Sequence, residues 1–266
     1  MTSARAFSLW EYGLRKENTK ENTSFRQGLP DNCNDAGGSI VELSSVIHWG
    51  RSLSEYKAMF SLSNHDLGKK ILGCGDGPAS FNAELTEQNG HVISVDPIYR
   101  FNANQIRARI DEVYSQVVEQ VSKNKDDYVW KHIPHVEALG KVRMQAMRLF
   151  LADYGVAKES GRYLNASLPT LPFDDGEFEI ALCSHYLFLY SEHVNQSQHI
   201  LSMKELCRIA KEVRVYPLLS LSDNQTSPHL KPVIAELEAD GISVDLVEVG
   251  YEFQKGATKM LVAKSV

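Results

Sequence analysis

The 266-residue sequence has little of what marks a secreted, membrane-spanning or metal-binding protein. It has four cysteines, Cys33, Cys74, Cys183 and Cys207, which share no close spacing, so neither a zinc site nor a disulfide framework is predicted. No apolar stretch approaches the roughly 18 residues of a membrane-spanning helix, and the N-terminus has no long apolar signal core. We therefore expect a cytoplasmic protein with no metal and no membrane partner.

Positive charge is also scarce. The chain has 28 Lys and Arg against 34 Asp and Glu, and the formal net charge of −6 gives no global attraction to nucleic acid or anionic membranes. A hydrophobic content of 43% is ordinary for a globular protein. A chain of this length can bury one substantial core, which favours one elaborated domain over two.

Glycines are concentrated in the segment Lys70–Gly77, where an apolar run is interrupted at Gly73, Gly75 and Gly77. This pattern predicts a buried strand that breaks into a tight turn, because glycine allows sharp turns and a close approach of the backbone to a ligand. A second apolar run ends at Asp96, which places a carboxylate at the end of the neighbouring strand, where it can bind ribose hydroxyls. Together these features predict a pocket for a nucleoside-containing cofactor.

The glycine spacing distinguishes between cofactors. A dinucleotide fingerprint G-x-G-x-x-G needs glycine or alanine where this chain has Pro78. The spacing G-x-G-x-G instead resembles motif I of the class I S-adenosylmethionine-dependent methyltransferases. Asn165–Ser167 and Leu171–His185 resemble that family's later blocks, which hold the adenine loop and strand four. The resemblance covers about Lys69 to Tyr190 and implies S-adenosylmethionine, not NAD, as the cofactor.

The resemblance also implies the residues of the site. The glycines would bring backbone amides to the carboxypropyl end of the cofactor, Asp96 would bind the ribose, and Asn165 and Ala166 would contact the adenine edge. The implied cofactor-binding set is Gly73, Cys74, Gly75, Gly77, Asp96, Pro97, Asn165, Ala166 and Ser184, and the catalytic candidates are His185 and Tyr186.

His185 is the candidate general base, because it follows strand four and an unperturbed imidazole titrates near neutral pH. A general base is needed only if the acceptor arrives protonated. The alternative is a histidine that stacks on adenine or caps the strand.

The chain departs from the family pattern in three places. Ile71 replaces the usual acid two residues before the first glycine, and Asn165 replaces the adenine-side Asp. The usual Pro-Gly-Gly turn before strand five is missing. A non-catalytic S-adenosylmethionine-binding protein therefore remains the alternative to an enzyme.

Two groups of residues outside the motifs have a functional and a structural interpretation. Trp49, Arg51 and Tyr56 precede the first strand, where Arg51 could pair with the cofactor carboxylate or simply lie on a solvated surface. Cations outnumber acids between Asp96 and Asn165, and interleaved aromatics could stack on bases. RNA methylation is therefore a further alternative, although solvated helix faces look the same.

The periodicity predicts the order of the elements. A capped helix opens at Ser52, and a helix runs from Pro78 to Asn89-Gly90. Two helices, over about 104–123 and 136–154, fill the long connection between the second strand and the adenine loop, and one of them is an insertion near the pocket mouth. The remaining expected elements are a helix over 197–210, a strand over 212–219, a helix over 228–239, and strands over 243–249 and 258–264.

These elements predict an α/β, Rossmann-like methyltransferase fold, with a mostly parallel seven-stranded sheet whose last strand is antiparallel. Residues 1–60 are expected to form an N-terminal arm and helical cap, and 61–266 the methyltransferase domain, with a helical insertion within about 97–160. The function implied is methyl transfer from S-adenosylmethionine to an unidentified, small-molecule acceptor.

Overall fold

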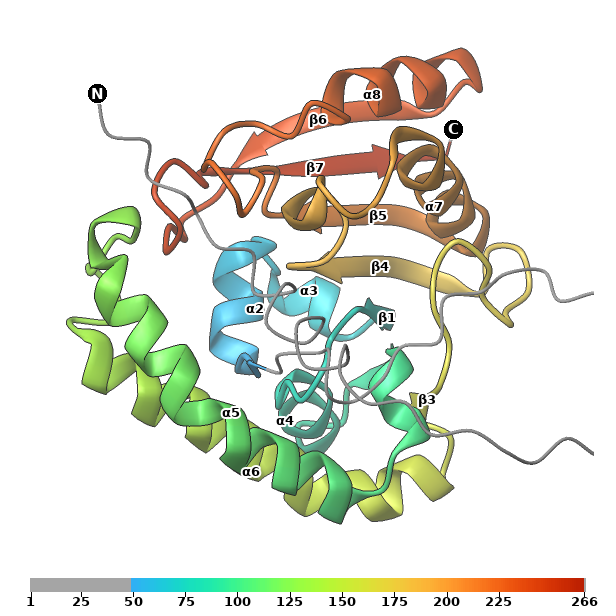
Figure 1. The fold of residues 1–266 in the computed structure, drawn as a ribbon. Coiled ribbons are helices and arrows are strands. Elements are labelled where there is room, and N and C mark those ends of the chain that lie inside the picture. The colour runs from blue at the N-terminus through green and yellow to red at the C-terminus, as the bar shows by residue number, and fades with distance from the viewer. Residues whose placement is uncertain (1–48, 266) are drawn as a thin grey trace, which may run out of the picture.

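The computed structural model describes residues 49–265, and every structural statement below concerns this part of the chain. Its centre is a seven-stranded sheet in the order β3-β2-β1-β4-β5-β7-β6 (Figure 1). Neighbouring strands are parallel, except that β7 is antiparallel to both β5 and β6. The strands are β1 (Lys70–Cys74), β2 (His91–Val95), β3 (Tyr163–Leu164), β4 (Phe178–Ser184), β5 (Ala210–Tyr216), β6 (Ser243–Glu248) and β7 (Lys259–Lys264). The expected fold class is confirmed.

Helices cover both faces of the sheet. Helices α7 and α8 pack on one face, and α2 and α4 pack on the other. The α-helices are α2 (Leu53–Met59), α3 (Asn64–Leu67), α4 (Phe81–Glu87), α5 (Ala103–Lys123), α6 (Val136–Glu159), α7 (Gln196–Ile209) and α8 (Leu230–Ala239). Short 3-10 turns follow β2 (η2, Pro97–Arg100), α5 (η3, Lys125–Asp127) and β4 (η4, Phe188–Tyr190). No helix within residues 49–265 is long and apolar enough to cross a membrane.

Strand β1 lies in the middle of the sheet and is buried on both faces. Ile71 and Leu72 are fully buried and belong to the apolar clusters on opposite faces. A parallel strand covered on both sides needs a continuous apolar sequence rather than an alternating one. The position where an acid is usual therefore holds Ile71, packed in the same cluster as Phe81 and Val92.

The connection between β2 and β3 is a pair of long helices packed side by side, α5 and α6 (Figure 1). We call this pair with its connecting segment, residues 103–159, the hairpin. Apolar side chains recur at helical spacing on α5, and those near its start share a cluster with Phe150 and Tyr154 of α6. Because α6 also packs on α4, α6 is the crossover helix and α5 is the added element. Both helices begin close to where the sequence predicts them, but α6 continues to Glu159, beyond the predicted end near 154.

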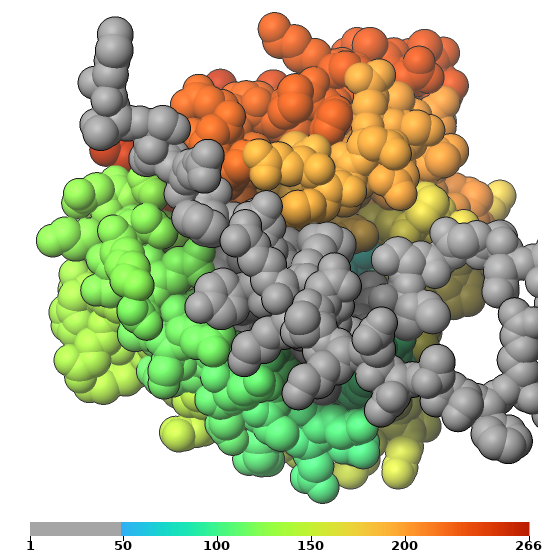
Figure 2. Space-filling model, viewed as in Figure 1, coloured from blue at the N-terminus to red at the C-terminus, as the bar shows by residue number. Residues whose placement is uncertain are grey.

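The tip of the hairpin is attached to the β6–β7 loop. The Val129 amide donates to the Phe253 carbonyl at 2.8 Å, and the Lys255 amide donates to the Asp127 carbonyl at 2.9 Å. The Tyr128 ring stacks on Phe253 at 4.8 Å between centroids. In the space-filling view the green hairpin forms the left side of this face, and the orange-to-red C-terminal region lies at its top (Figure 2).

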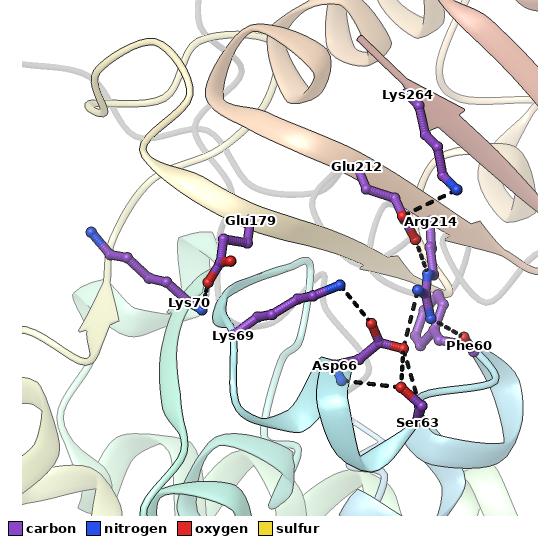
Figure 3. Close-up of polar contacts among 9 residues, drawn as sticks. All are labelled: Phe60, Ser63, Asp66, Lys69, Lys70, Glu179, Glu212, Arg214 and Lys264. Carbon is purple, nitrogen blue, oxygen red and sulfur yellow. Dashed lines mark hydrogen bonds and ion pairs between the residues drawn. The ribbon is translucent and has the colours of Figure 1, made fainter. Parts of the chain in front are cut away.

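An ionic network ties α3 to strand β5 (Figure 3). Asp66 caps its own helix by accepting from the Ser63 amide at 3.1 Å and pairs with Lys69 at 2.8 Å. Arg214 of β5 reaches Asp66 at 3.3 Å and donates to the Phe60 carbonyl at 2.7 Å. The short helix is thus held against the sheet by charge as well as by packing.

Several boundaries differ from the sequence predictions, among them those of α4 and β5. The helix expected from Pro78 begins at Phe81, because the intervening residues complete the turn after the glycines and the Ser80 amide donates to the Arg51 carbonyl at 3.0 Å. Strand β5 begins at Ala210, before the predicted start at 212. It ends at Tyr216, because Pro217 has no N–H with which to continue the ladder. Most of the expected N-terminal arm, residues 1–48, lies outside the described residues.

Candidate functional site

The glycine turn after β1 is shaped by close backbone contacts. A β-carbon at Gly73 would lie 1.8 Å from Asp76 Oδ2, and one at Gly75 would lie 2.9 Å from the Tyr186 β-carbon. Gly75 and Gly77 also have φ angles of +71° and +54°, which side chains disfavour. The spacing of these glycines predicts a tight turn, and the structure shows that the turn requires glycine at these positions.

Asp96 lies at the end of β2, next to this turn. Its Oδ2 accepts from the Gly77 amide at 2.9 Å, and its Oδ1 accepts from the Ile98 amide at 2.9 Å. Burial raises the pKa of Asp96 to about 6, although both amides oppose that shift. The carboxylate is therefore mostly ionised at about pH 7, and each oxygen keeps a further lone pair for a ribose hydroxyl.

Asp76 is a site residue that the sequence analysis did not select. Its carboxylate accepts from the Tyr56 hydroxyl and from the Ser94 hydroxyl, both at 2.7 Å. It thereby ties the glycine turn to α2 and to β2, and burial raises its pKa to about 7. An acid set between two motif glycines was the available signal, but its partners lie 18 and 20 positions away in the chain.

The polar residues after β4 lie beside the turn, because β4 pairs with β1 in the register Cys74–Cys183. His185 has a left-handed backbone with φ +51°, and its amide donates to the Tyr216 carbonyl at 2.8 Å. Its Nδ1 lies 3.0 Å from Ser184 Oγ. Burial, reinforced by Arg51 and Arg143, lowers the pKa of His185 well below 6.5, so the imidazole is neutral at about pH 7. The sequence argument had used the unperturbed pKa, which burial does not preserve.

The other predicted site residues lie in three places. Asn165 and Ala166 follow β3, which pairs with the end of β2 in the register Val95–Leu164 and so brings Asn165 beside Asp96. Asn165 is exposed, and Ala166 is half-buried. Pro97 is the first residue of η2, and Tyr186 packs on Gly75 as described above.

Cys74 and Cys183 are buried free thiols on paired strands. Cys207 is also a free thiol, and Cys33 lies outside the described residues.

The segment before α2 lies against the glycine turn. A β-carbon at Gly50 would lie 2.1 Å from the Pro78 carbonyl oxygen, so the chain passes directly over the turn there. Tyr56 is fully buried and bonds to Asp76, whereas Trp49 is half-buried and packs against the hairpin. Arg51 is half-buried between these two, so it is not a freely solvated surface residue.

Comparisons with known proteins give one related sequence and a set of similar folds. No protein-family model matches the chain. An uncharacterised protein of Methanocaldococcus jannaschii is 29% identical over 225 residues, which are 84% of this chain and 98% of that protein.

Two of the solved structures that resemble this chain are methyltransferases. One is magnesium protoporphyrin IX methyltransferase from Synechocystis PCC 6803 with bound S-adenosylmethionine, at a TM-score of 0.42 and 13% identity over 80% of this chain and 78% of that chain. Another is an S-adenosylmethionine-dependent methyltransferase from Aquifex aeolicus, at a TM-score of 0.40 and 16% identity over 80% of this chain and 89% of that chain.

The strand order of this chain identifies its fold. A parallel sheet in the order 3-2-1-4-5, extended by an antiparallel β7 and then β6, carries the glycine turn after β1 and Asp96 after β2. This chain has the fold of the class I S-adenosylmethionine-dependent methyltransferases.

Proposed function

We propose that the chain binds S-adenosylmethionine and transfers its methyl group to a small-molecule acceptor. The observation that supports this best is one juxtaposition at the carboxyl edge of the sheet. The glycine turn, the Asp96 carboxylate and the Ser184–His185 pair follow three adjacent strands, β1, β2 and β4. Open α/β sheets bind ligands at this edge.

The chemistry asks little of the protein beyond alignment. A lone pair of the acceptor would form the new bond to the methyl carbon, and the electron pair of the broken carbon–sulfur bond would neutralise the sulfonium. The glycine turn and Asp96 would hold the cofactor, which supplies the activated methyl group. The principal contribution of the chain is therefore proximity and orientation.

If the atom that receives the methyl group carries a proton, a base must remove that proton. His185 is suited to that role. With Nδ1 directed at Ser184 Oγ, the other ring nitrogen, Nε2, has no hydrogen bond within residues 49–265. A neutral imidazole can take a proton there and pass it to solvent. Its low pKa makes it a weak base that is always in the correct protonation state at neutral pH.

Cofactor binding is tested by calorimetry with S-adenosylmethionine and S-adenosylhomocysteine. Asp96→Ala should weaken binding by about 1.5–3 kcal/mol, the range for a hydrogen bond to a charged group. Asp245→Ala, an exposed acid on β6, is the matched control and should bind like the wild type. Tight NAD binding, or no binding of either sulfur ligand, would contradict the proposal.

Turnover is tested separately, because a binding protein would pass the first test. The wild type is incubated with S-adenosylmethionine and with the small-molecule and RNA fractions of a cell extract, and S-adenosylhomocysteine is measured. Formation with the small-molecule fraction alone supports the proposed acceptor class. Formation only with RNA would replace that class, and cofactor that survives every fraction would indicate a binder without turnover.

A further inference from the structure

A buried charged cluster lies between α2, α6 and the β6–β7 loop. Arg143 Nη1 of α6 contacts both oxygens of Glu55 of α2, at 2.6 and 2.5 Å. The Tyr251 hydroxyl donates to Glu55 Oε1 at 3.0 Å, and the Ser52 amide donates to Oε2 at 3.1 Å. Burial would raise the pKa of Glu55, but Arg143 outweighs it and the pKa is lowered, so the carboxylate is charged and its hydrogen-bonding capacity is largely used.

The guanidinium groups, by contrast, have donors to spare. Arg143 is completely buried, yet among residues 49–265 its Nε and Nη2 have no hydrogen-bond partner. In this described part of the chain Arg51 Nε also has none, and Arg51 Nη1 has only a 3.4 Å contact to the Trp49 carbonyl. Glu55 is the only carboxylate within residues 49–265 that bonds to either guanidinium, so the cluster carries two cations and one anion.

The cluster lies on the catalytic side of the proposed site. The Arg51 carbonyl accepts from the Ser80 amide at 3.0 Å, and the preceding Gly50 lies between the Pro78 carbonyl and the Met147 side chain of α6. On the other side of the cluster, the ring of Tyr251 lies 6.1 Å from the ring of Tyr216, which lies 5.6 Å from the ring of His185. The cluster therefore adjoins the glycine turn and is joined to His185 through two aromatic rings, and its two cations also lower the pKa of His185.

We propose that Arg51 and Arg143 form an anion-binding subsite that receives a carboxylate or phosphate group of a ligand bound at the proposed methyl-transfer site. A buried, incompletely paired cation is unfavourable until an anion joins it, and guanidinium forks bind carboxylates and phosphates with directed hydrogen bonds. The inference rests on the proposed function for the identity of the site. The anion has two possible sources, the methionine carboxylate of the cofactor or an acidic group of the acceptor.

Two pairs of probes separate these sources. The first pair is S-adenosylhomocysteine and 5′-methylthioadenosine, which share the adenosine and thioether but differ in the carboxylate. The second pair is benzoate and inorganic phosphate, each titrated onto the protein with S-adenosylhomocysteine in excess. If no sulfur ligand binds the wild type, the proposed function fails, and the anion titrations are run on the free protein.

The variants remove donors with little disturbance of the fold. Arg51→Gln removes a charge that bonds to no carboxylate within the described residues, and Arg51→Lys keeps the charge but not the fork. Arg143→Lys can keep the ion pair with Glu55 while it loses the two free nitrogens. Arg148→Gln, an exposed arginine on the same helix as Arg143, is the control.

We expect Arg51→Gln and Arg143→Lys each to weaken an anionic probe about tenfold or more, as for a lost charge-assisted hydrogen bond. Loss for S-adenosylhomocysteine with no change for 5′-methylthioadenosine assigns the subsite to the cofactor carboxylate. Loss for benzoate or phosphate alone assigns it to the acceptor. The inference is overturned if no anionic probe is weakened, or if 5′-methylthioadenosine is weakened as much as S-adenosylhomocysteine.

Discussion

His185 adopts a backbone conformation that side chains disfavour, with φ +51° at the first position after β4. Its amide remains bonded to the Tyr216 carbonyl of the neighbouring strand, and its ring lies 5.6 Å from the Tyr216 ring in an edge-on arrangement. The neighbouring strand thus holds the sharp turn that directs the imidazole. Strain of this kind occurs often at functional sites.

Substitutions of His185 distinguish two roles for this residue, a general base and a ring that stacks on the cofactor. His185→Gln should keep S-adenosylhomocysteine affinity within a few-fold and lower turnover by about 10²–10⁴, the usual contribution of a general base. Because the pKa of His185 lies well below 6.5, protonation of this imidazole should not lower wild-type turnover between about pH 8 and 6.5. Steady-state kinetics across that range, with the acceptor found from extract, is the measurement.

His185→Phe and His91→Gln complete the comparison, since His91 is an exposed histidine at the start of β2. Full activity in His185→Gln would exclude the base role. Affinity lost in the Gln variant and retained in the Phe variant would show that the ring stacks on the cofactor.

At the scale of single residues, local signals were sufficient to predict the glycine turn and the position of Asp96 at the end of its strand. They were insufficient to predict that Arg143 and Glu55 pair. Glycine spacing reports a backbone requirement, which is local in sequence. Arg143 and Glu55 are 88 positions apart, and each has the sequence context of an ordinary amphipathic helix. Only the packing of α6 on α4, and the ion pair that joins α6 to α2, show that one of many helical arginines is buried.

At the scale of elements, α3 is a four-residue helix that cannot be stable through its own hydrogen bonds. Its capping box between Ser63 and Asp66 and the contact of Asp66 with Arg214 compensate for its length (Figure 3). The element therefore depends on one carboxylate that serves the helix and the sheet together.

Asp66→Asn should lower the free energy of unfolding by about 1–3 kcal/mol at about pH 7, because it weakens charge-assisted bonds to Lys69 and Arg214. Burial acts to raise the pKa of Asp66, but Lys69, Ser63 and Arg214 outweigh it and the pKa is lowered well below 3.8. A lowered folded-state pKa gives stability above the unfolded value that is lost as the pH falls below it. The difference from the wild type should therefore shrink as the pH is lowered from about 7 to 3.

Urea unfolding at several pH values measures this effect, with the exposed Asp245→Asn as the control. A difference that stays constant with pH would show that packing, rather than charge, explains the loss.

The types of the elements were predictable because apolar periodicity is repeated over many consecutive residues of each helix or strand, so no single residue decides it. Element ends were less so. The start of α4 depends on the bond from the Ser80 amide to the Arg51 carbonyl, a contact between segments 29 residues apart that no local pattern records. The end of β5 was visible in principle, since Pro217 follows it directly.

At the scale of the whole molecule, the β6–β7 loop joins three features. Tyr251 bonds to Glu55, the Phe253 ring lies 6.0 Å from the Arg143 guanidinium, and the Phe253 carbonyl accepts from Val129 at the hairpin tip. The hairpin and the charged cluster therefore share one loop. The sequence predicts an insertion near the pocket mouth, and if the hairpin opens there as a lid, the loop contacts at its tip must break.

Phe253→Ala tests that coupling, because it removes the stacking on Tyr128 and the edge contact with Trp130, at 4.8 and 5.7 Å. Aromatic pairs contribute roughly 0.5–1.5 kcal/mol each beyond their buried area, so the tip should open about tenfold more often or more. Hydrogen exchange of the Val129 and Lys255 amides should accelerate accordingly, and proteolysis between Lys123 and Asp127 should increase.

S-adenosylhomocysteine should slow both the hydrogen exchange and the proteolysis of the wild type if ligand binding favours the closed hairpin. The exposed Leu246→Ala on β6 serves as the control. Unchanged exchange at Val129 in Phe253→Ala would mean that the two backbone hydrogen bonds alone hold the tip, and unchanged exchange with ligand would mean that the hairpin is a fixed wall of the site rather than a lid.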